Sequence, residues 1–197
     1  MITLDNHNAT SNLTQFVGLM EVVNSLYRAN PLNPPRPMDI SRDDVKGLFE
    51  SLSRYQVRYL LVGGLAGVVH GHIRATQDLD LWIQTGDDNK DRLIMALREN
   101  EVAGAELLKN TPLLFGWTSV VTGKHGLTLD MGHALKAFGE LDFDACYERA
   151  VNASFDGVPF RVIHLNDLIK EKQTTGRLKD LADVEELKRI NNERNTD

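Results

Sequence analysis

The sequence has little cysteine and no long apolar run. Cys146 is the only cysteine, so no disulfide can form within the chain. No stretch is apolar enough to cross a bilayer, and the first residues, MITLDNHNATSN, lack the basic and apolar regions of a signal peptide. We therefore expect a cytoplasmic protein with no membrane segment and no special role for Cys146.

An excess of positive charge is also missing. The chain has 22 Lys and Arg against 28 Asp and Glu, which gives a formal net charge of −6. Proteins that bind nucleic acid non-specifically usually carry a basic surface, so this balance argues against a DNA-coating role. An RNA substrate held at one local basic patch stays compatible with the composition.

The chain divides into an N-terminal extension and a main domain. Apolar residues recur at helical spacing over residues 11–29, which predicts an amphipathic helix. The prolines of NPLNPPRP, residues 30–37, then predict an extended linker, because a helix cannot continue through them. We assign residues 1–37 to the extension and residues 38–197 to the domain. The helix is expected to pack on the domain or on another subunit.

The main domain interleaves predicted strands and helices, which indicates an α/β or α+β class. Strands are predicted over residues 57–62, 78–84, 113–121, 126–131, 153–155 and 159–163. Helices are predicted over residues 41–55, 65–72, 87–100, 142–150, 165–175 and from 178 onward.

Local signals mark several of these boundaries. Ser41 and Asp44 resemble a capping box, with Asp in place of the usual Glu. Asp156-Gly157 predicts a hairpin turn, and Gly176 suits a helix C-terminus. The last helix is expected to bury one apolar stripe, formed by Leu178, Leu181, Val184 and Leu187.

Two carboxylates share one face of the strand that begins at residue 78. Side chains alternate along a strand, so Asp78 and Asp80 point the same way, about 7 Å apart at Cα. Adjacent carboxylates repel each other, and oxygen ligands of this kind suit Mg²⁺ or Mn²⁺. The alternative is an ordinary polar face on a half-buried strand, although Asp is depleted in strands.

A third carboxylate strengthens the metal interpretation. Asp130 lies in the alternating stretch Leu127–Met131 and shares its face with Thr128. If this strand neighbours the first one, three carboxylates converge as in a two-metal phosphoryl-transfer site. The alternative is that Asp130 simply ends a strand at Gly132.

A glycine pair, Gly63-Gly64, follows the buried strand that ends at Val62. Glycine lets the backbone approach a ligand closely, and amides at a helix N-terminus favour phosphate. The spacing matches neither a P-loop nor a dinucleotide fingerprint, and an ordinary turn is the alternative.

Together these pieces resemble the signature of the nucleotidyltransferase superfamily, which has the DNA polymerase β-like fold. The matching pattern is Gly63-Gly64, thirteen residues, Asp78-Leu79-Asp80, and later Asp130. Over about residues 41–190, the stretches YLLVGGLAGVVHGHIRATQDLDLWI and HLNDLIKEKQTTGRLKDLADVEEL are similar to the bacterial AbiEii-like (abortive-infection) group. That group includes nucleotidyltransferases of toxin–antitoxin pairs and many stand-alone proteins, and this chain looks more like the stand-alone members.

The resemblance implies a small mixed β-sheet flanked by helices, with further helices at the C-terminus. It implies a Mg²⁺-dependent (or Mn²⁺-dependent) enzyme that moves a nucleoside monophosphate from an NTP to a hydroxyl group of an acceptor. The acceptor would be tRNA, a protein or a small molecule, and a toxin-like activity would be one option. The N-terminal helix would then contact an antitoxin or form a homodimer.

Residue roles follow from the same resemblance. Asp78 and Asp80 would bind the metal ions that hold the NTP, and Asp130 would complete the metal site nearer the attacking hydroxyl. Gly63 and Gly64 would cradle the phosphates. Basic residues would face the triphosphate or the acceptor, namely Arg74, Lys172, Arg177 and Lys179.

Blander interpretations of these and other residues stay open. Lys172, Arg177 and Lys179 suit solvated surfaces of the terminal helices equally well, and Lys179 with Asp183 has the spacing of an i,i+4 pair. Gly64 replaces the Ser of many active family members, so a silent nucleotide-binding or protein-interaction module is the alternative function. We expect structural roles for Asp180 and Asp183 or, alternatively, contacts with the acceptor. Core or structural roles are expected for Trp82, His70, His72, His125 and His133.

Overall fold

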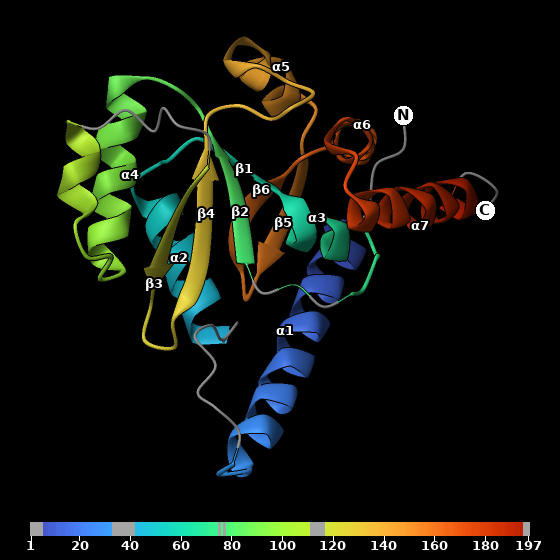
Figure 1. Cartoon of the computed structure of the whole chain (residues 1–197). Helices are drawn as coiled ribbons and strands as arrows, with labels where there is room; N and C mark the ends of the chain where they lie inside the picture. Colours follow the sequence, from blue (N-terminus) through green and yellow to red (C-terminus); the bar gives the residue numbers. More distant parts are fainter. Residues whose placement is uncertain (1–5, 33–41, 75, 77, 111–116, 195–197) are drawn as a thin grey trace.

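The computed structural model describes residues 6–32, 42–74, 76, 78–110 and 117–194 (Figure 1). Its centre is a sheet of six strands in the order β3-β4-β2-β1-β6-β5. The strands are β1 Tyr59–Val62, β2 Asp78–Ile83, β3 Thr118–Thr122, β4 Leu127–Gly132, β5 Val151–Phe155 and β6 Val158–Val162. The β1–β6 and β2–β4 pairs are parallel and the other pairs are antiparallel, so the sheet is mixed.

Helices flank this sheet and follow it at the C-terminus. The helices are α1 Asn6–Ala29, α2 Arg42–Arg54, α3 Gly63–Val69, α4 Asp87–Glu99, α5 Phe143–Glu148, α6 Leu165–Thr175 and α7 Leu178–Arg194. Two 3-10 turns, Ala105–Lys109 and Glu140–Asp142, complete the described elements. The predicted α/β (α+β) class, with a small mixed sheet and C-terminal helices, is confirmed.

The apolar side chains of β2 are buried and lie on one face of the sheet. Leu79, Leu81 and Ile83 are at most 1% exposed. Leu81 pairs with Leu61, so the same face also carries Tyr59, which stacks on Phe49 of α2. Helix α2 packs in turn on α4. The opposite face of β2 is therefore the one that presents Asp78 and Asp80.

The N-terminal helix packs on the main domain mainly through its first half. Leu13, Phe16 and Val17 are buried where α1 contacts β5 and α3. The second half extends beyond the sheet, and its Val22 and Leu26 are more than half exposed (Figure 1). Residues 33–37 of the predicted linker lie outside the described residues, and the division at residue 37 stays a prediction.

Several predicted boundaries agree with the structure. Asp156 and Gly157 turn the β5–β6 hairpin with φ of 50° and 82°, as a two-residue turn requires. Gly176 ends α6 in the left-handed region, and its amide donates to the carbonyl of Lys172. Strand β1 begins at Tyr59 rather than at residue 57, and residues 113–116 of the strand predicted over 113–121 lie outside the described part.

The predicted apolar stripe of the last helix is wrong in its first half. Leu178 is 88% exposed and Leu181 is 44% exposed. The buried face instead begins with Asp180 and Asp183, and apolar burial starts only at Val184. The reason is chemical: cations from other elements pair with these two carboxylates, so burying them is tolerated.

Asp44 has a tertiary partner that its place in the sequence does not reveal. Its buried carboxylate accepts hydrogen bonds from the backbone amides of Lys124 and His125, at 3.0 and 2.8 Å. These bonds tie α2 to the turn between β3 and β4. Ser41, the other half of the predicted capping box, lies outside the described residues.

Among the described helices, none has the length and apolar character needed to cross a membrane.

Candidate active site

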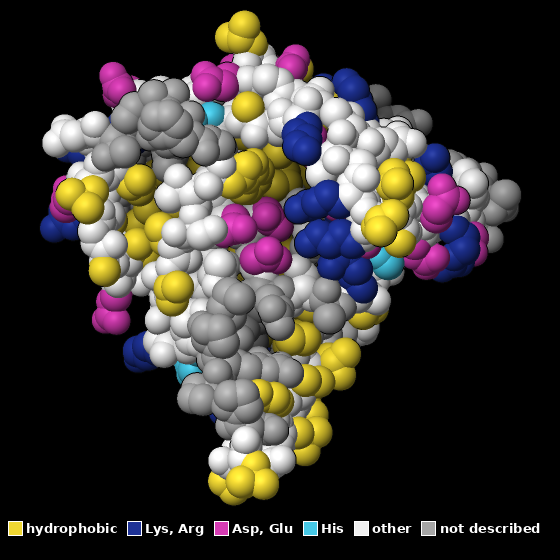
Figure 2. Space-filling model, viewed as in Figure 1, with side chains coloured by type: hydrophobic (Ala, Val, Ile, Leu, Met, Phe, Trp, Pro, Cys, Tyr) yellow, Lys and Arg dark blue, Asp and Glu magenta, His cyan; other side chains and the backbone are white. Residues whose placement is uncertain are grey.

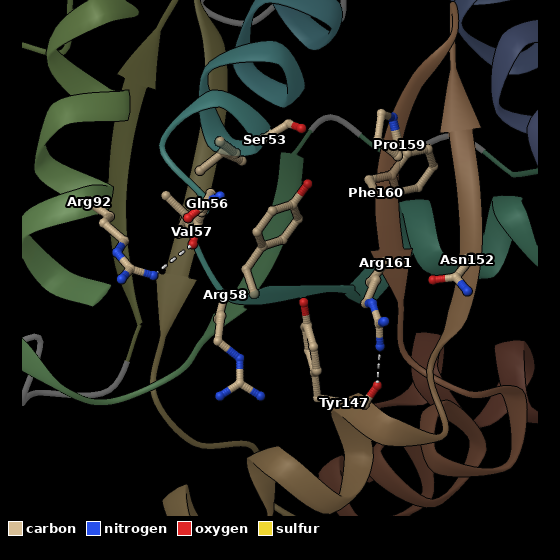
Figure 3. A pocket seen from close by; sticks show the side chains of 12 residues that line it. Ser53, Gln56, Val57, Arg58, Arg92, Tyr147, Asn152, Pro159, Phe160 and Arg161 are labelled. Carbon is tan, nitrogen blue, oxygen red and sulfur yellow. Dashed lines mark hydrogen bonds between the residues drawn. The ribbon is translucent and has the colours of Figure 1, made fainter. Parts of the chain in front are cut away.

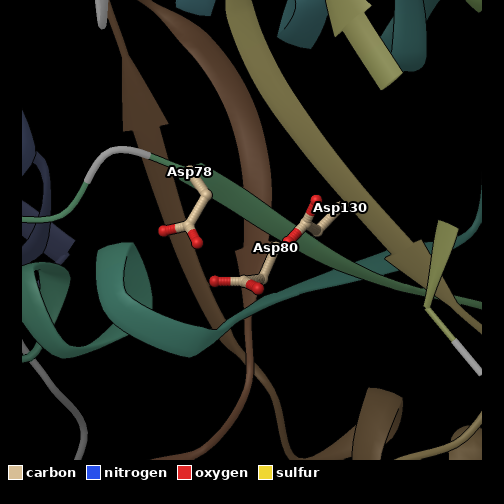
Figure 4. Close-up of side chains that lie close together, drawn as sticks. All are labelled: Asp78, Asp80 and Asp130. Atoms are coloured by element: carbon tan, nitrogen blue, oxygen red, sulfur yellow. The ribbon is translucent and has the colours of Figure 1, made fainter. Parts of the chain in front are cut away.

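Two neighbouring parallel strands bring three carboxylates together. Strand β2 pairs with β4 so that Asp80 lies opposite Asp130, and Asp78 precedes Asp80 on the same face. One oxygen from each of the three carboxylates lies within 4.8 Å of the others (Figure 4). The strands that carry Asp80 and Asp130 are therefore neighbours, a condition that the sequence alone could not establish.

Repulsion within this group contributes to a raised pKa of Asp80. Burial, and then the charges of Asp78 and Asp130, raise the pKa of Asp80 from 3.8 to about 6. The Gly64 amide and Lys172 oppose this rise without cancelling it. A divalent cation would remove the repulsion, and a set of carboxylate oxygens is what Mg²⁺ and Mn²⁺ prefer. The donor set therefore fits such an ion.

Hydrogen bonds fix the orientation of each carboxylate. Thr76 Oγ1 donates to Asp78 Oδ1 at 2.8 Å, and Ser119 Oγ donates to Asp130 Oδ1. The Gly64 amide donates to Asp80 Oδ2 at 3.4 Å. Sequence reasoning missed Thr76 and Ser119. The only signal for Thr76 was its position two residues before Asp78, whereas Ser119 is found only from the β3–β4 pairing.

Neighbouring side chains leave no room for a Cβ at either glycine of the pair. Gly63 has φ of +65°, and a Cβ built on it would lie 1.8 Å from Asp80 Oδ2. A Cβ on Gly64 would lie 2.4 Å from Thr76 Oγ1. Both glycines open α3, whereas the sequence placed that helix from residue 65. Because these two residues have no side chains, α3 can begin in direct contact with Asp80 and Thr76.

A buried ion-pair network lies on the C-terminal helices. Asp183 accepts hydrogen bonds from Arg74 Nε at 2.6 Å, from Lys172 Nζ at 2.6 Å, and pairs with His72 at 3.0 Å. Burial alone raises the pKa of Asp183, but the hydrogen bonds from Arg74 and Lys172 outweigh it and hold that pKa well below its ordinary value. Asp180 pairs with Lys172 and Arg177 in the same way.

This network lies beside the acidic group. Figure 2 shows Lys and Arg side chains gathered next to the central Asp and Glu side chains. Lys172 lowers the pKa of Asp80, while Asp80 and Asp78 add to the rise in the pKa of Arg177 that its bond to Asp180 chiefly causes. Three predicted basic residues, Arg74, Lys172 and Arg177, are thus brought together near the carboxylates.

Lys179, the fourth predicted basic residue, is placed differently. It is exposed on α7 and has no ion-pair partner within the part of the chain that the structure describes. The i,i+4 pair with Asp183 does not form, because Asp183 is 2% exposed and its oxygens face Arg74, His72 and Lys172. Asp180 and Asp183 hold structural positions, as the sequence suggested.

The remaining candidates have structural partners. Trp82 is fully buried, donates from Nε1 to the carbonyl of His133 at 2.6 Å, and packs against aromatic rings of the core. The ring of His70 contacts the carbonyl of Ile163 at 2.8 Å, and His125 contacts Asp44. Within the described residues, Asp78, Asp80 and Asp130 form the one cluster suited to a metal ion.

A cavity of about 480 Å³ is lined by residues other than the three carboxylates (Figure 3). It is lined by Tyr59 at the start of β1, by Tyr147, and by the arginines Arg58, Arg92 and Arg161. The carboxylates instead lie at the end of β1, where Val62 pairs with Asp80. No carboxylate lines this cavity, so the metal-dependent chemistry that the acidic group permits does not belong to it.

Comparison with known proteins gives a family. A family model described as "Nucleotidyltransferase of unknown function (DUF6036)" matches residues 40–193. The matched range includes the three carboxylates, the glycine pair and the basic residues described above. A search of the curated proteins found no match. The resemblance to the AbiEii-like group stays a prediction.

Proposed function

The chain belongs to this nucleotidyltransferase family, and we propose that it transfers a nucleoside monophosphate from an NTP to a hydroxyl group of an acceptor. In this proposal Asp78, Asp80 and Asp130 hold divalent metal ions, Mg²⁺ or Mn²⁺. The observation that carries it is the register of β2 and β4, which sets Asp80 opposite Asp130 and gathers three carboxylate oxygens within 4.8 Å.

The reaction follows from the chemistry of this group. Bound metal ions would neutralise charge on the phosphates and make the acceptor hydroxyl more acidic. The acceptor oxygen forms a bond to the α-phosphorus, the bond from that phosphorus to the bridging oxygen of the β-phosphate breaks, and pyrophosphate leaves. The hydroxyl proton passes to Asp130 Oδ2, because Ser119 already donates to Oδ1.

The surroundings of the carboxylates support a triphosphate at this place. Gly63 and Gly64 leave the start of α3 without side chains next to Asp80. Lys172 and Arg177 supply positive charge beside the carboxylates, and Arg74 shares the partner Asp183 with Lys172. Asp183 positions Arg74 and Lys172 by accepting their hydrogen bonds, so its role is indirect.

Thr76 supports an active enzyme over a silent module. The missing Ser at position 64 is the departure that suggested a silent protein. In the structure, a Cβ at that position would meet Thr76 Oγ1 and Cβ, at 2.4 and 2.9 Å. The Thr76 hydroxyl therefore fills the space that a side chain at 64 would take, and it donates to Asp78. A hydroxyl group is present at this place despite Gly64.

A transfer assay tests the proposal. Purified protein is incubated with Mg²⁺, each α-labelled NTP in turn, and total tRNA or lysate. We expect label on an acceptor with the wild type, none with Asp78→Asn/Asp80→Asn, and undiminished label with Arg92→Ala, which changes the distant cavity. Equal transfer by the double variant would refute the proposal. NTP binding by the wild type without transfer to any acceptor would favour the silent module.

A further inference from the structure

An exposed tryptophan lies close to the three carboxylates. Trp117 immediately precedes β3 and is 39% exposed. The β3–β4 register pairs Ser119 with Asp130 and Thr118 with Met131, so Trp117 comes level with Gly132. A Cβ built on Gly132 would lie 3.1–3.2 Å from three atoms of the indole. Because these three distances are nearly equal, a face of the ring, and not its edge, is turned toward Gly132.

The indole is on the carboxylate side of the sheet. Asp130 and Gly132 are two residues apart on β4, so their side-chain directions coincide. The ring that covers Gly132 therefore lies on the face from which the Asp130 carboxylate projects, about 7 Å further along the strand. Gly132 is needed there, because any side chain would displace the indole.

Two rows of residues cross the strands at this point. Asp80, Asp130 and Ser119 form the first row, and Trp82, Gly132 and Trp117 form the second. The two tryptophans differ in their surroundings. Trp82 is covered by Phe138 and Phe143 and is fully buried. Trp117 is 39% exposed, so part of its ring can be reached by a ligand.

The location also separates two parts of a nucleotide. Trp117 adjoins β3, at the sheet edge beyond Asp130 on β4. Arg74 and Lys172 lie near Asp78 and Asp80 of β2, on the other side of the acidic group. Phosphates near the cations and a planar ring on the indole would thus straddle the three carboxylates.

We propose that the outer face of Trp117 is a stacking platform for a nucleobase. The inference rests on the proposed function, and it adds the recognition of a base to the binding of phosphates. An indole stacks on any base, since every base has a π-face. The base comes either from the incoming NTP or from the end of an RNA acceptor, and the experiment distinguishes these sources.

Tryptophan fluorescence gives a readout that needs no turnover. The chain has two tryptophans, so Trp117→Phe leaves only the buried Trp82 as an internal control. Wild-type protein with Mg²⁺ is titrated separately with an NTP, a short oligoribonucleotide, and inorganic tripolyphosphate, which has no base. We expect quenching by a base-bearing ligand in the wild type, none in Trp117→Phe, and little with tripolyphosphate.

Affinities measured by calorimetry complete the test. Trp117→Ala should weaken the binding of the base-bearing ligand roughly 5- to 150-fold, as expected for one lost base stack. Trp117→Phe should recover most of that affinity, and tripolyphosphate should bind all variants equally. Val121→Ala is the matched control, because Val121 is exposed on the same face of the same strand. A change confined to the NTP assigns the base to the incoming nucleotide; one confined to the oligoribonucleotide assigns it to the acceptor.

The outcomes separate this inference from the proposed function. If Trp117→Ala binds both base-bearing ligands as tightly as the wild type while label transfer persists, the platform is refuted and the enzyme stands. If the wild type binds neither the NTP nor tripolyphosphate, the proposed function fails and the platform fails with it.

Discussion

Asp80 and Asp130 lie opposite one another on two parallel strands, although they are far apart in the sequence. This pairing joins a carboxylate of β2 to one of β4 at the same level of the sheet, with Asp78 beside them. The cluster destabilises the metal-free protein, because three negative charges share a half-buried position. The same arrangement creates a set of ligands that a cation would stabilise.

Replacing Asp80 by Asn should stabilise the metal-free protein above pH 6. The folded pKa of Asp80 is raised from 3.8 to about 6, so folding loses stability as pH rises through this window. The neutral amide of Asp80→Asn avoids this loss, which amounts to about 1–3 kcal/mol at pH 8. Urea unfolding in EDTA at pH 4 and pH 8 measures it.

The same unfolding experiment carries its own control. The difference between the two proteins should shrink at pH 4, where Asp80 is protonated in the folded state. Adding Mg²⁺ at pH 8 should stabilise the wild type and have a smaller effect on Asp80→Asn. A wild type that is the more stable of the two at pH 8 in EDTA would contradict the raised pKa.

Gly63→Ala should abolish metal binding and transfer. Its methyl group would lie 1.8 Å from Asp80 Oδ2, and its φ of +65° adds about 1–2 kcal/mol of backbone strain. Gly157→Ala separates these effects, since Gly157 also has positive φ but nothing within 4 Å of its Cβ position. Calorimetric titration with Mn²⁺ should show loss of binding in Gly63→Ala only. Equal binding by both variants would mean that Asp80 moves aside without consequence.

Asp183→Asn should destabilise the fold and weaken phosphate binding together. The change removes the buried charge that both Lys172 and Arg74 pair with, and breaking such a buried pair typically costs about 3–5 kcal/mol. The pKa of Asp183 is held low, so this stabilisation is present above its ordinary pKa and is lost as pH falls further. Thermal unfolding and tripolyphosphate titration measure the two effects.

Glu186→Gln is the matched variant on the same helix. Glu186 pairs with Arg189 at the surface of α7, so its loss should change stability and tripolyphosphate affinity little. If Asp183→Asn lowers stability but binds tripolyphosphate with unchanged affinity, the network is structural only and does not position phosphate-binding groups.

Gly64→Ser should be harmful alone and tolerated with a second change. The new side chain meets Thr76 Oγ1 and Cβ, at 2.4 and 2.9 Å from the Cβ position. Thr76→Gly removes both contacts, so Gly64→Ser/Thr76→Gly should be more stable than the two separate losses of stability predict. A double-mutant cycle by urea unfolding gives this coupling. Strictly additive losses would show that Thr76 does not fill the space of a side chain at position 64.

Local patterns predicted a large share of the fold. Alternation along β2 placed Asp78 and Asp80 on one face, and turn residues placed the hairpin at Asp156-Gly157 and the helix end at Gly176. These features depend on backbone geometry over a few residues, which neighbouring side chains determine directly.

Other features required contacts between distant segments. The prediction for α7 failed at Leu178 and Leu181 because the partners of Asp180 and Asp183 come from α6 and from the segment before β2. A helical pattern alone cannot reveal that a buried carboxylate has a cation to pair with.

The chemistry of the candidate site can be predicted from the residues alone: two carboxylates on one strand, a third on another, and glycines before them. Three features become known only from the folded chain: β4 lies beside β2, Thr76 and Ser119 orient the acids, and Trp117 is the exposed tryptophan. They could not be predicted because strand order and register depend on packing between segments that are distant in the sequence. The backbone groups that pair two strands are the same in almost every residue, so the residues of one strand do not identify the strand beside it.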